Sequence, residues 1–209
     1  MKKVLVAAVA ALSMLTFATV ASAALSPGVY DPGNTGCPKA TYAKGVLHLE
    51  KNCATSVNAA AGADITGAEG QAFASASFTL ASASQCQGGS PRFNVDTTTG
   101  FFFLGCNNVV PTMNADGTVT YLFNAATLAA AGQQVPTPTG AIKSVSVLID
   151  VEGKADLTNI TLNGKKQKVT KRTSGLASAP CKNGGWKTFN TPRAFKNQGD
   201  CIQYVNTGK

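Results

Sequence analysis

Short stretches of alternating apolar and polar residues dominate the chain from residue 40 onwards, and this period of two is typical of β-strands with one buried face. Strands are predicted at residues 45–49, 71–80, 92–96, 101–104, 118–123, 142–151 and 157–162. In the stretch 71–80, the predicted buried face includes Phe78 and Leu80. Residues 101–104 read Phe-Phe-Phe-Leu, and this run without polar residues predicts a central strand of a sandwich.

The segments between these strands contain turn residues. Asp116-Gly117 predicts a hairpin turn into the strand 118–123. Residues 124–131 predict a short surface helix, with Asn124 as its N-cap and Gly132 as its stop. Short strands without alternating long helices predict an all-β fold, an antiparallel β-sandwich of jelly-roll-like type.

The first residues have the features of a secretory signal peptide. Lys2 and Lys3 precede an apolar stretch at residues 4–20, and small residues at 21–23 supply a cleavage site before Ala24. We therefore expect a secreted protein, extracellular or periplasmic, without a membrane span in the mature chain. The expected organisation is a signal peptide (1–23), a β-sandwich domain (24–164), a basic linker (165–180) and a small cysteine-closed C-terminal module (181–209).

Charge is scarce and unevenly distributed. Only 13% of residues are charged, which excludes a coiled coil and a highly charged disordered chain. Residues 24–163 contain six basic and nine acidic residues, whereas residues 164–209 contain ten basic residues and one acidic residue. Five of these positive charges lie within eight positions: Lys165, Lys166, Lys168, Lys171 and Arg172. Such a cluster attracts polyanions in a salt-sensitive manner, although it is also compatible with an ordinary solvated linker.

Six cysteines follow the predicted signal peptide: Cys37, Cys53, Cys86, Cys106, Cys181 and Cys201. An even number in an exported chain predicts three disulfides, for which 15 connectivities are possible. The sequential pairing 37–53, 86–106 and 181–201 is favoured, because each pair brackets one turn-containing unit. The chain has no C-x-x-C motif and only one histidine, so a zinc–thiolate site is disfavoured.

The C-terminal unit contains aromatic residues that suit either binding or packing. Trp186 and Tyr204 could stack on sugar rings or nucleobases, or could form a small core behind a disulfide. A helical reading of residues 197–205 places Cys201 and Tyr204 on one face.

Several segments resemble known secreted proteins. Residues 64–67, 86–95 (with Gly-Ser-Pro-Arg-Phe at 89–93), 103–106, 149–153 and 157–164 are similar to a group of secreted bacterial β-sandwich domains to which we assign no activity. Separately, residues 181–186 (Cys-Lys-Asn-Gly-Gly-Trp) and 195–205 resemble a short C-terminal module that recurs on otherwise different secreted bacterial proteins. The resemblance supports the 86–106 and 181–201 disulfides.

Few residues suggest catalysis. His48 lies in a predicted strand without a nearby nucleophile motif, which indicates a structural or surface histidine. Asp150, Glu152 and Asp156 could hold Ca²⁺, or the first two could act as a glycosidase pair, or all three could be solvated. Arg92 could contact a ligand but is expected to pair with a nearby aspartate.

The sequence therefore predicts a non-catalytic secreted binding protein without a cofactor, apart from possible calcium. The expected ligand is carbohydrate or another anionic surface polymer, bound at the basic cluster, Trp186 and Tyr204; nucleic acid would bind only as a non-specific polyanion. The alternatives are a carboxylate-dependent glycan hydrolase and a structural component of an envelope or biofilm.

Overall fold

The computed structural model describes residues 24–132, 135–169, 184–188 and 195–201, and the predicted signal peptide lies outside these ranges. Sheet A contains, in spatial order, β1 (Ala24–Tyr30), β4 (Ala60–Thr66), β10 (Ile142–Ile149), β6 (Arg92–Thr97) and β7 (Phe101–Gly105). Sheet B contains, in spatial order, β2 (Pro38–Ala43), β3 (Val46–Lys51), β11 (Gly153–Leu162), β5 (Ala76–Leu80), β9 (Val119–Phe123) and β8 (Thr112–Met113), and β12 (Lys165–Lys166) pairs with β11. The helical elements are η1 (Ala83–Gln85), η2 (Cys106–Asn108), α1 (Ala125–Ala130) and η4 (Gly185–Thr188).

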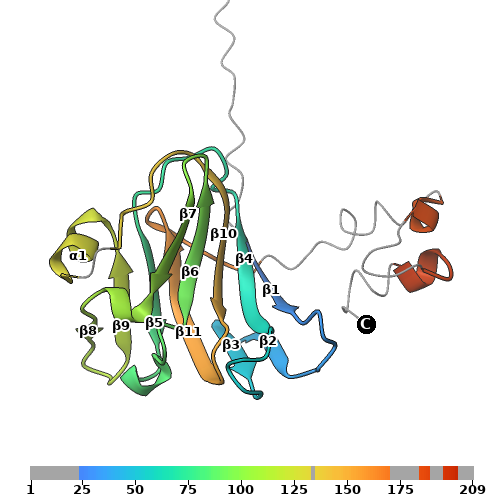
Figure 1. Cartoon of the computed structure of the whole chain (residues 1–209), viewed down its shortest axis with the longest axis horizontal. Coiled ribbons are helices and arrows are strands. Elements are labelled where there is room, and N and C mark those ends of the chain that lie inside the picture. Colours follow the sequence, from blue (N-terminus) through green and yellow to red (C-terminus); the bar gives the residue numbers. More distant parts are fainter. Residues whose placement is uncertain (1–23, 133–134, 170–183, 189–194, 202–209) are drawn as a thin grey trace, which may run out of the picture.

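The two antiparallel sheets pack together as a sandwich, which confirms the predicted fold class (Figure 1). Eight strands define the topology of the sandwich. In spatial order they are β3-β11-β5-β9 of sheet B and β4-β10-β6-β7 of sheet A. Numbered in chain order, these are the first, eighth, third and sixth strands facing the second, seventh, fourth and fifth. This strand order is that of a jelly roll, so the prediction of a jelly-roll-like sandwich is also confirmed.

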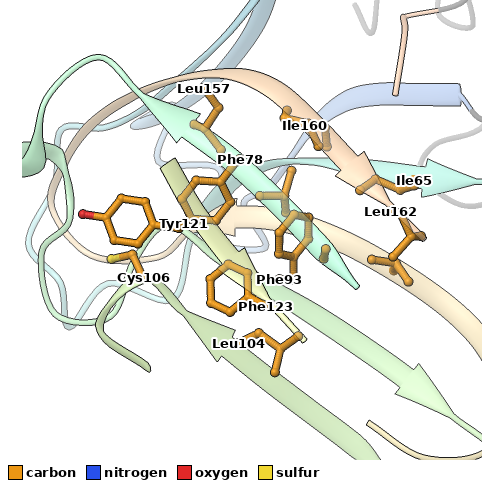
Figure 2. Close-up of a cluster of buried hydrophobic side chains, with 14 of the residues drawn as sticks. Ile65, Phe78, Phe93, Leu104, Cys106, Tyr121, Phe123, Leu157, Ile160 and Leu162 are labelled. Carbon is orange, nitrogen blue, oxygen red and sulfur yellow. The ribbon is translucent and has the colours of Figure 1, made fainter. Parts of the chain in front are cut away.

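Alternating residues from both sheets fill the space between them. Phe78 of β5 is fully buried, and its ring centroid lies 5.5 Å from that of Phe93, 5.4 Å from that of Tyr121 and 5.7 Å from that of Phe123. Figure 2 shows this aromatic centre flanked by aliphatic side chains, among them Leu104 and Leu157. Aromatic pairs at these separations stabilise a core beyond their buried area.

Each observed disulfide closes one hairpin. Cys37–Cys53 spans β2 and β3, and Cys86–Cys106 spans β6 and β7, as predicted. Cys201 is also disulfide-bonded, but its predicted partner Cys181 lies outside the described residues.

The predicted turn chemistry is confirmed at two places. Asn124 caps α1, because its side chain accepts the Thr127 N–H at 2.9 Å while the Thr127 hydroxyl accepts the Asn124 N–H at 3.0 Å. Gly117 adopts a positive φ of 82° in the hairpin between β8 and β9. Both segments follow local rules that need no long-range contact.

Two strand predictions are corrected. The prediction of a strand from residue 71 is wrong for its first part, because β5 begins only at Ala76. The side chain of Asn163 replaces the missing strand bonds: its Oδ1 accepts the N–H groups of Ala74 and Ser75, and its Nδ2 donates to the Ala72 carbonyl. These backbone groups are therefore satisfied without a neighbouring strand.

The prediction of residues 101–104 as a central strand is also wrong. β7 forms an edge of sheet A, and although Leu104 is buried, Phe101 and Phe103 each remain 53% exposed. The run of apolar residues therefore reflects an exposed aromatic surface rather than burial on both faces.

Beyond β11, the chain stays in contact with the sandwich. β12 pairs with β11, and the Leu25 N–H donates to the Lys168 carbonyl at 3.0 Å. In the part of the chain that the structure describes, no helix is long and apolar enough to cross a membrane.

Candidate functional site

The predicted basic cluster is only partly within the described residues. Lys165, Lys166 and Lys168 are all exposed, and the Lys166 ammonium donates to Asn159 Oδ1 at 2.8 Å. Lys171 and Arg172 lie outside the described residues. Lys165 and Lys166 thus present positive charge at β12 of sheet B, whereas Lys168 lies alongside β1 of sheet A.

Of the two aromatic residues predicted to bind a ligand in the C-terminal unit, one lies within the described residues and one lies outside them. Trp186 is half-buried, with the Lys187 ammonium 5.5 Å from its ring centroid. Phe195 and Cys201 are buried, and residues 198–201 are helical, in agreement with the start of the predicted helix. Tyr204 lies outside the described residues.

The three candidate calcium ligands are not brought together. Asp150 follows β10 and pairs with Arg92, whereas Asp156 lies in β11 and pairs with His48. Glu152 lies in the connection between these strands, where its N–H donates to Thr55 Oγ1 at 3.1 Å. Among the described residues, no group of three or more His, Cys, Asp or Glu is arranged to hold a metal ion.

His48 lies on the outer face of sheet B. Its Nδ1 is 2.6 Å from Asp156 Oδ1, and Gln85 holds the same aspartate by accepting its N–H at 3.1 Å and donating to its Oδ2 at 3.4 Å. Both the histidine and the aspartate side chains are almost half exposed. This arrangement agrees with the interpretation of His48 as a surface histidine.

A more organised group of side chains lies on the outer face of sheet A. Arg92 of β6 forms a two-point ion pair with Asp150, with Nη1–Oδ1 at 2.7 Å and Nη2–Oδ2 at 2.6 Å. This confirms the expected aspartate partner. Its Nε donates to Asn94 Oδ1 at 2.9 Å, and the Ser90 hydroxyl donates to Asp150 at 2.8 Å. Two parallel bonds fix the plane of the guanidinium as well as its position.

Electrostatics keep this aspartate ionised. Partial burial tends to raise the pKa of Asp150, but hydrogen bonds from Arg92 and Ser90, together with the positive charge of Arg92, outweigh it. The resulting pKa lies below the ordinary value of 3.8. The Arg92–Asp150 pair is therefore a permanent pair of charges at neutral pH.

Two exposed aromatic rings adjoin the ion pair. The Arg92 guanidinium lies 5.1 Å from the ring centroid of Phe103, a cation–π distance, and the rings of Phe103 and Phe101 are 5.0 Å apart. Phe103 is directly opposite Asn94 in the sheet, so both side chains project from the same face. We name Arg92, Asn94, Phe101, Phe103 and Asp150 the Arg92 site.

A shallow depression of about 350 Å³ borders the Arg92 site; its lining residues are Gly88, Gly89, Arg92, Phe103, Gly105, Asn107 and Asn108. The absence of side chains at two glycines shapes it. A Cβ at Gly105 would lie 2.6 Å from the Gly89 carbonyl oxygen, so the loop can approach the strand only when glycine is present. The Asn108 side chain, which also lines the depression, accepts the Gly105 N–H at 2.6 Å.

A second hollow lies on the same face, over β1, β4 and β10. It encloses about 300 Å³, and Gly28, Gly62 and Leu148 contribute to its lining. Strand register places these three residues in one row with Arg92 and Gly105, across all five strands. With strands about 4.8 Å apart, the row spans roughly 19 Å.

A buried lysine is bonded to the backbone of Asp150, one of the residues of the Arg92 site. Lys51 is fully buried, and its ammonium donates to the carbonyls of Thr55 (3.1 Å), Val57 (2.7 Å) and Asp150 (2.7 Å). It therefore ties the loop after β3 to the backbone of the residue that holds Arg92. Lys51 lies two residues beyond the predicted strand 45–49, and the sequence pattern there does not indicate its burial.

Sequence reasoning identified Arg92 and Asp150 but not the aromatic part of the site. The run at residues 101–104 predicts burial of Phe101 and Phe103, and the alternation at residues 92–96 indicates only that Asn94 belongs to a strand. The available signal was that alternation itself, because Arg92 and Asn94 must share the face opposite Phe93. Comparison with known proteins finds no matching family model, no matching curated protein and no matching solved structure.

Proposed function

We propose that this protein is a secreted, non-catalytic binding protein that holds a carbohydrate chain on the outer face of sheet A. The observation that carries the proposal is the Arg92 site: two exposed aromatic rings beside a fixed guanidinium–carboxylate pair at the edge of a depression. A sugar ring presents an apolar C–H face and a rim of hydroxyl groups. Exposed phenyl rings suit the first, and Arg92, Asp150 and Asn94 suit the second.

The electrostatics of Asp150 argue against a role as the general acid of a glycosidase. A glycosidase needs one carboxyl group that remains protonated in order to donate to the leaving oxygen. The lowered pKa of Asp150 makes it unsuited to that role, since Arg92 and Ser90 hold it as an anion. It instead provides a fixed hydrogen-bond acceptor.

Export is supported by two kinds of observation. The disulfides Cys37–Cys53 and Cys86–Cys106 are typical of proteins that work in an oxidising compartment. The basic start, apolar stretch and small-residue site of residues 1–23 are the expected export signal.

The exposed basic cluster gives the same protein a second, electrostatic contact. Lys165 and Lys166 are exposed at β12 of sheet B, and Lys168 is exposed beside β1 at the edge of sheet A. An anionic cell-surface polymer could be held along these lysines while a sugar chain occupies the outer face of sheet A. Replacing Lys165, Lys166, Lys168, Lys171 and Arg172 with glutamine should weaken retention on such a polymer at low salt and leave retention at high salt unchanged. Equal retention of both proteins at low salt would remove the cluster from the proposal.

The main test is a glycan array probed with the oxidised protein, residues 24–209, followed by titration of the strongest hit against variants. Phe103→Ala should weaken binding about tenfold or more, because a central aromatic contact is lost. The matched control is Leu122→Ala, which removes a 41% exposed side chain from sheet B and should bind like wild type. Equal affinities of the two variants, or an array without a hit, would overturn the proposal.

A further inference from the structure

The four outer strands of the two sheets differ in how they are protected from pairing with another chain. Natural sheet edges usually carry proline, charge or very short strands, or are covered by other segments. β1 contains Pro27 and is covered at Leu25 by the bond to Lys168. β2 contains Pro38 and Lys39. β8 has only two residues.

β7 has none of these protections. Its sequence, Phe-Phe-Phe-Leu-Gly, contains neither proline nor charge, and it pairs only with β6. Of the edges in the described sandwich, β7 is therefore the one suited to accept a further strand.

Two hydrogen bonds fix which backbone groups of β7 point outward. The Thr97 N–H donates to the Gly100 carbonyl, and the Cys106 N–H donates to the Pro91 carbonyl, each across directly opposed residues. In an antiparallel ladder such bonded pairs recur at every second residue. The backbone groups of Phe102 and Leu104 consequently face β6, while those of Phe101, Phe103 and Gly105 face away from it.

One end of this outward edge is already occupied. Asn108 Oδ1 accepts the Gly105 N–H at 2.6 Å. Within the described part of the chain, the outward N–H and C=O groups of Phe101 and Phe103 have no hydrogen-bond partner. The free edge thus consists of two donors and two acceptors in a short, regular array.

We propose that β7 pairs in antiparallel fashion with β7 of a second copy, centred on Phe102, and joins two sheets A into one continuous sheet. In this register Phe101 lies opposite Phe103 of the second copy and exchanges both backbone bonds with it, and the same holds for Phe103. All the free groups of the edge are satisfied, and the Gly105 end held by Asn108 is not needed. The array is therefore complementary to itself under a two-fold rotation, as an isologous interface requires.

The side chains agree with the same register. Phe101 and Phe103 project from the outer face, so each ring gains a cross-strand aromatic neighbour from the second copy. Their rings project from the outer face of the sheet, whereas their free backbone groups lie in the plane of the sheet and point away from β6. Pairing through the backbone therefore leaves the Arg92 site on the surface. The inference is independent of carbohydrate binding and is tested without a glycan.

The test is sedimentation of the oxidised protein, residues 24–209, across a concentration series. A monomer–dimer equilibrium that closes at two copies is expected. Phe101→Lys should raise the dissociation constant about tenfold or more, because lysine on an edge strand opposes pairing. Val29→Lys places the same charge on β1, at a residue that is also 53% exposed, and should dimerise like wild type.

A charge pair tests the register directly. Phe101→Lys and Phe103→Glu, each weakly dimeric alone, should form a mixed dimer, since the lysine of one copy lies opposite the glutamate of the other. A wild-type protein that remains monomeric, associates without limit or responds equally to Phe101→Lys and Val29→Lys would overturn the inference. Failure of the mixture to dimerise would overturn the proposed register.

Discussion

The outer faces of the two sheets are built from the same alternating pattern but differ in how their side chains are used. On sheet B, neighbouring polar groups bond one another: Ser77 with Thr161 at 2.7 Å and Thr79 with Thr120 at 2.9 Å. On sheet A, Phe101 and Phe103 remain half exposed beside a fixed Arg92–Asp150 pair.

This difference shows why alternation alone does not identify a binding face. Hydroxyl groups on adjacent strands can satisfy each other, so the face of sheet B offers few groups to a partner. An exposed phenyl ring has no polar group with which a neighbour could form a hydrogen bond. Its apolar surface therefore remains available for a ligand or a second chain. The comparison leads to four predictions, from the largest effect to the smallest.

Removing the buried lysine should have the largest effect. Lys51→Met leaves three carbonyl groups without their donor, one of them that of Asp150, and should lower the free energy of unfolding by about 3 kcal/mol. Chemical denaturation measures this. Lys154→Met on sheet B is the control; its side chain is 73% exposed and pairs with Glu50, so it should change stability by less than about 0.5 kcal/mol.

Filling the hollow of sheet A should have the next effect. A Cβ at Gly62 would lie 2.6 Å from the Val147 carbonyl oxygen and 2.7 Å from Leu148 Cβ, so Gly62→Ala should destabilise the protein by about 2 kcal/mol. Gly28, opposite it on β1, has open space around the corresponding position. Thermal unfolding that shows equal losses for Gly28→Ala and Gly62→Ala would contradict this packing.

Neutralising Asp150 should cost about 1 kcal/mol at pH 7, because the ion pair with Arg92 is partly exposed and screened. The pKa of Asp150 is lowered in the folded state. Its stabilisation is therefore complete above the ordinary pKa of 3.8, and is lost as the pH falls through the lower, folded-state pKa. The difference in stability between wild type and Asp150→Asn should shrink below pH 4; a constant difference down to pH 2 would refute this linkage.

The smallest effect is expected on sheet B. Thr79→Val removes one hydroxyl from the bond with Thr120 and should cost about 0.5–1 kcal/mol, without any change in glycan binding. Asn114 Nδ2 also donates to Thr120 at 3.0 Å, so Thr120 keeps a partner. A loss of glycan binding in this variant would show that sheet B takes part in recognition.

Local sequence signals predicted much of the fold. The alternation around Phe78 and Phe93 and the Asn124 cap depend on neighbouring residues, and both were confirmed. The sequential pairing of cysteines was confirmed for Cys37–Cys53 and Cys86–Cys106. The start of β5 was missed because it depends on Asn163, which is 88 residues away from Ser75 in the chain.

The candidate site was harder to predict because it depends on strand order. A run such as Phe-Phe-Phe-Leu is equally compatible with a central strand and an exposed edge, and only pairing across the whole sheet distinguishes them. An aspartate partner for Arg92 could be expected from charge, but its identity as Asp150 required the pairing of β6 with β10. Its contact with Phe103 and the depression beside it required the register of β6 with β7.

The most direct test is an NMR titration of the oxidised, ¹⁵N-labelled protein with the glycan that the array identifies. Our account predicts saturable shifts in the amides of β6, β7 and the Gly88–Gly89 loop, with β5 and β9 unaffected. Shifts confined to sheet B, or to the basic residues after β11, would show that the aromatic face of sheet A is not the binding surface.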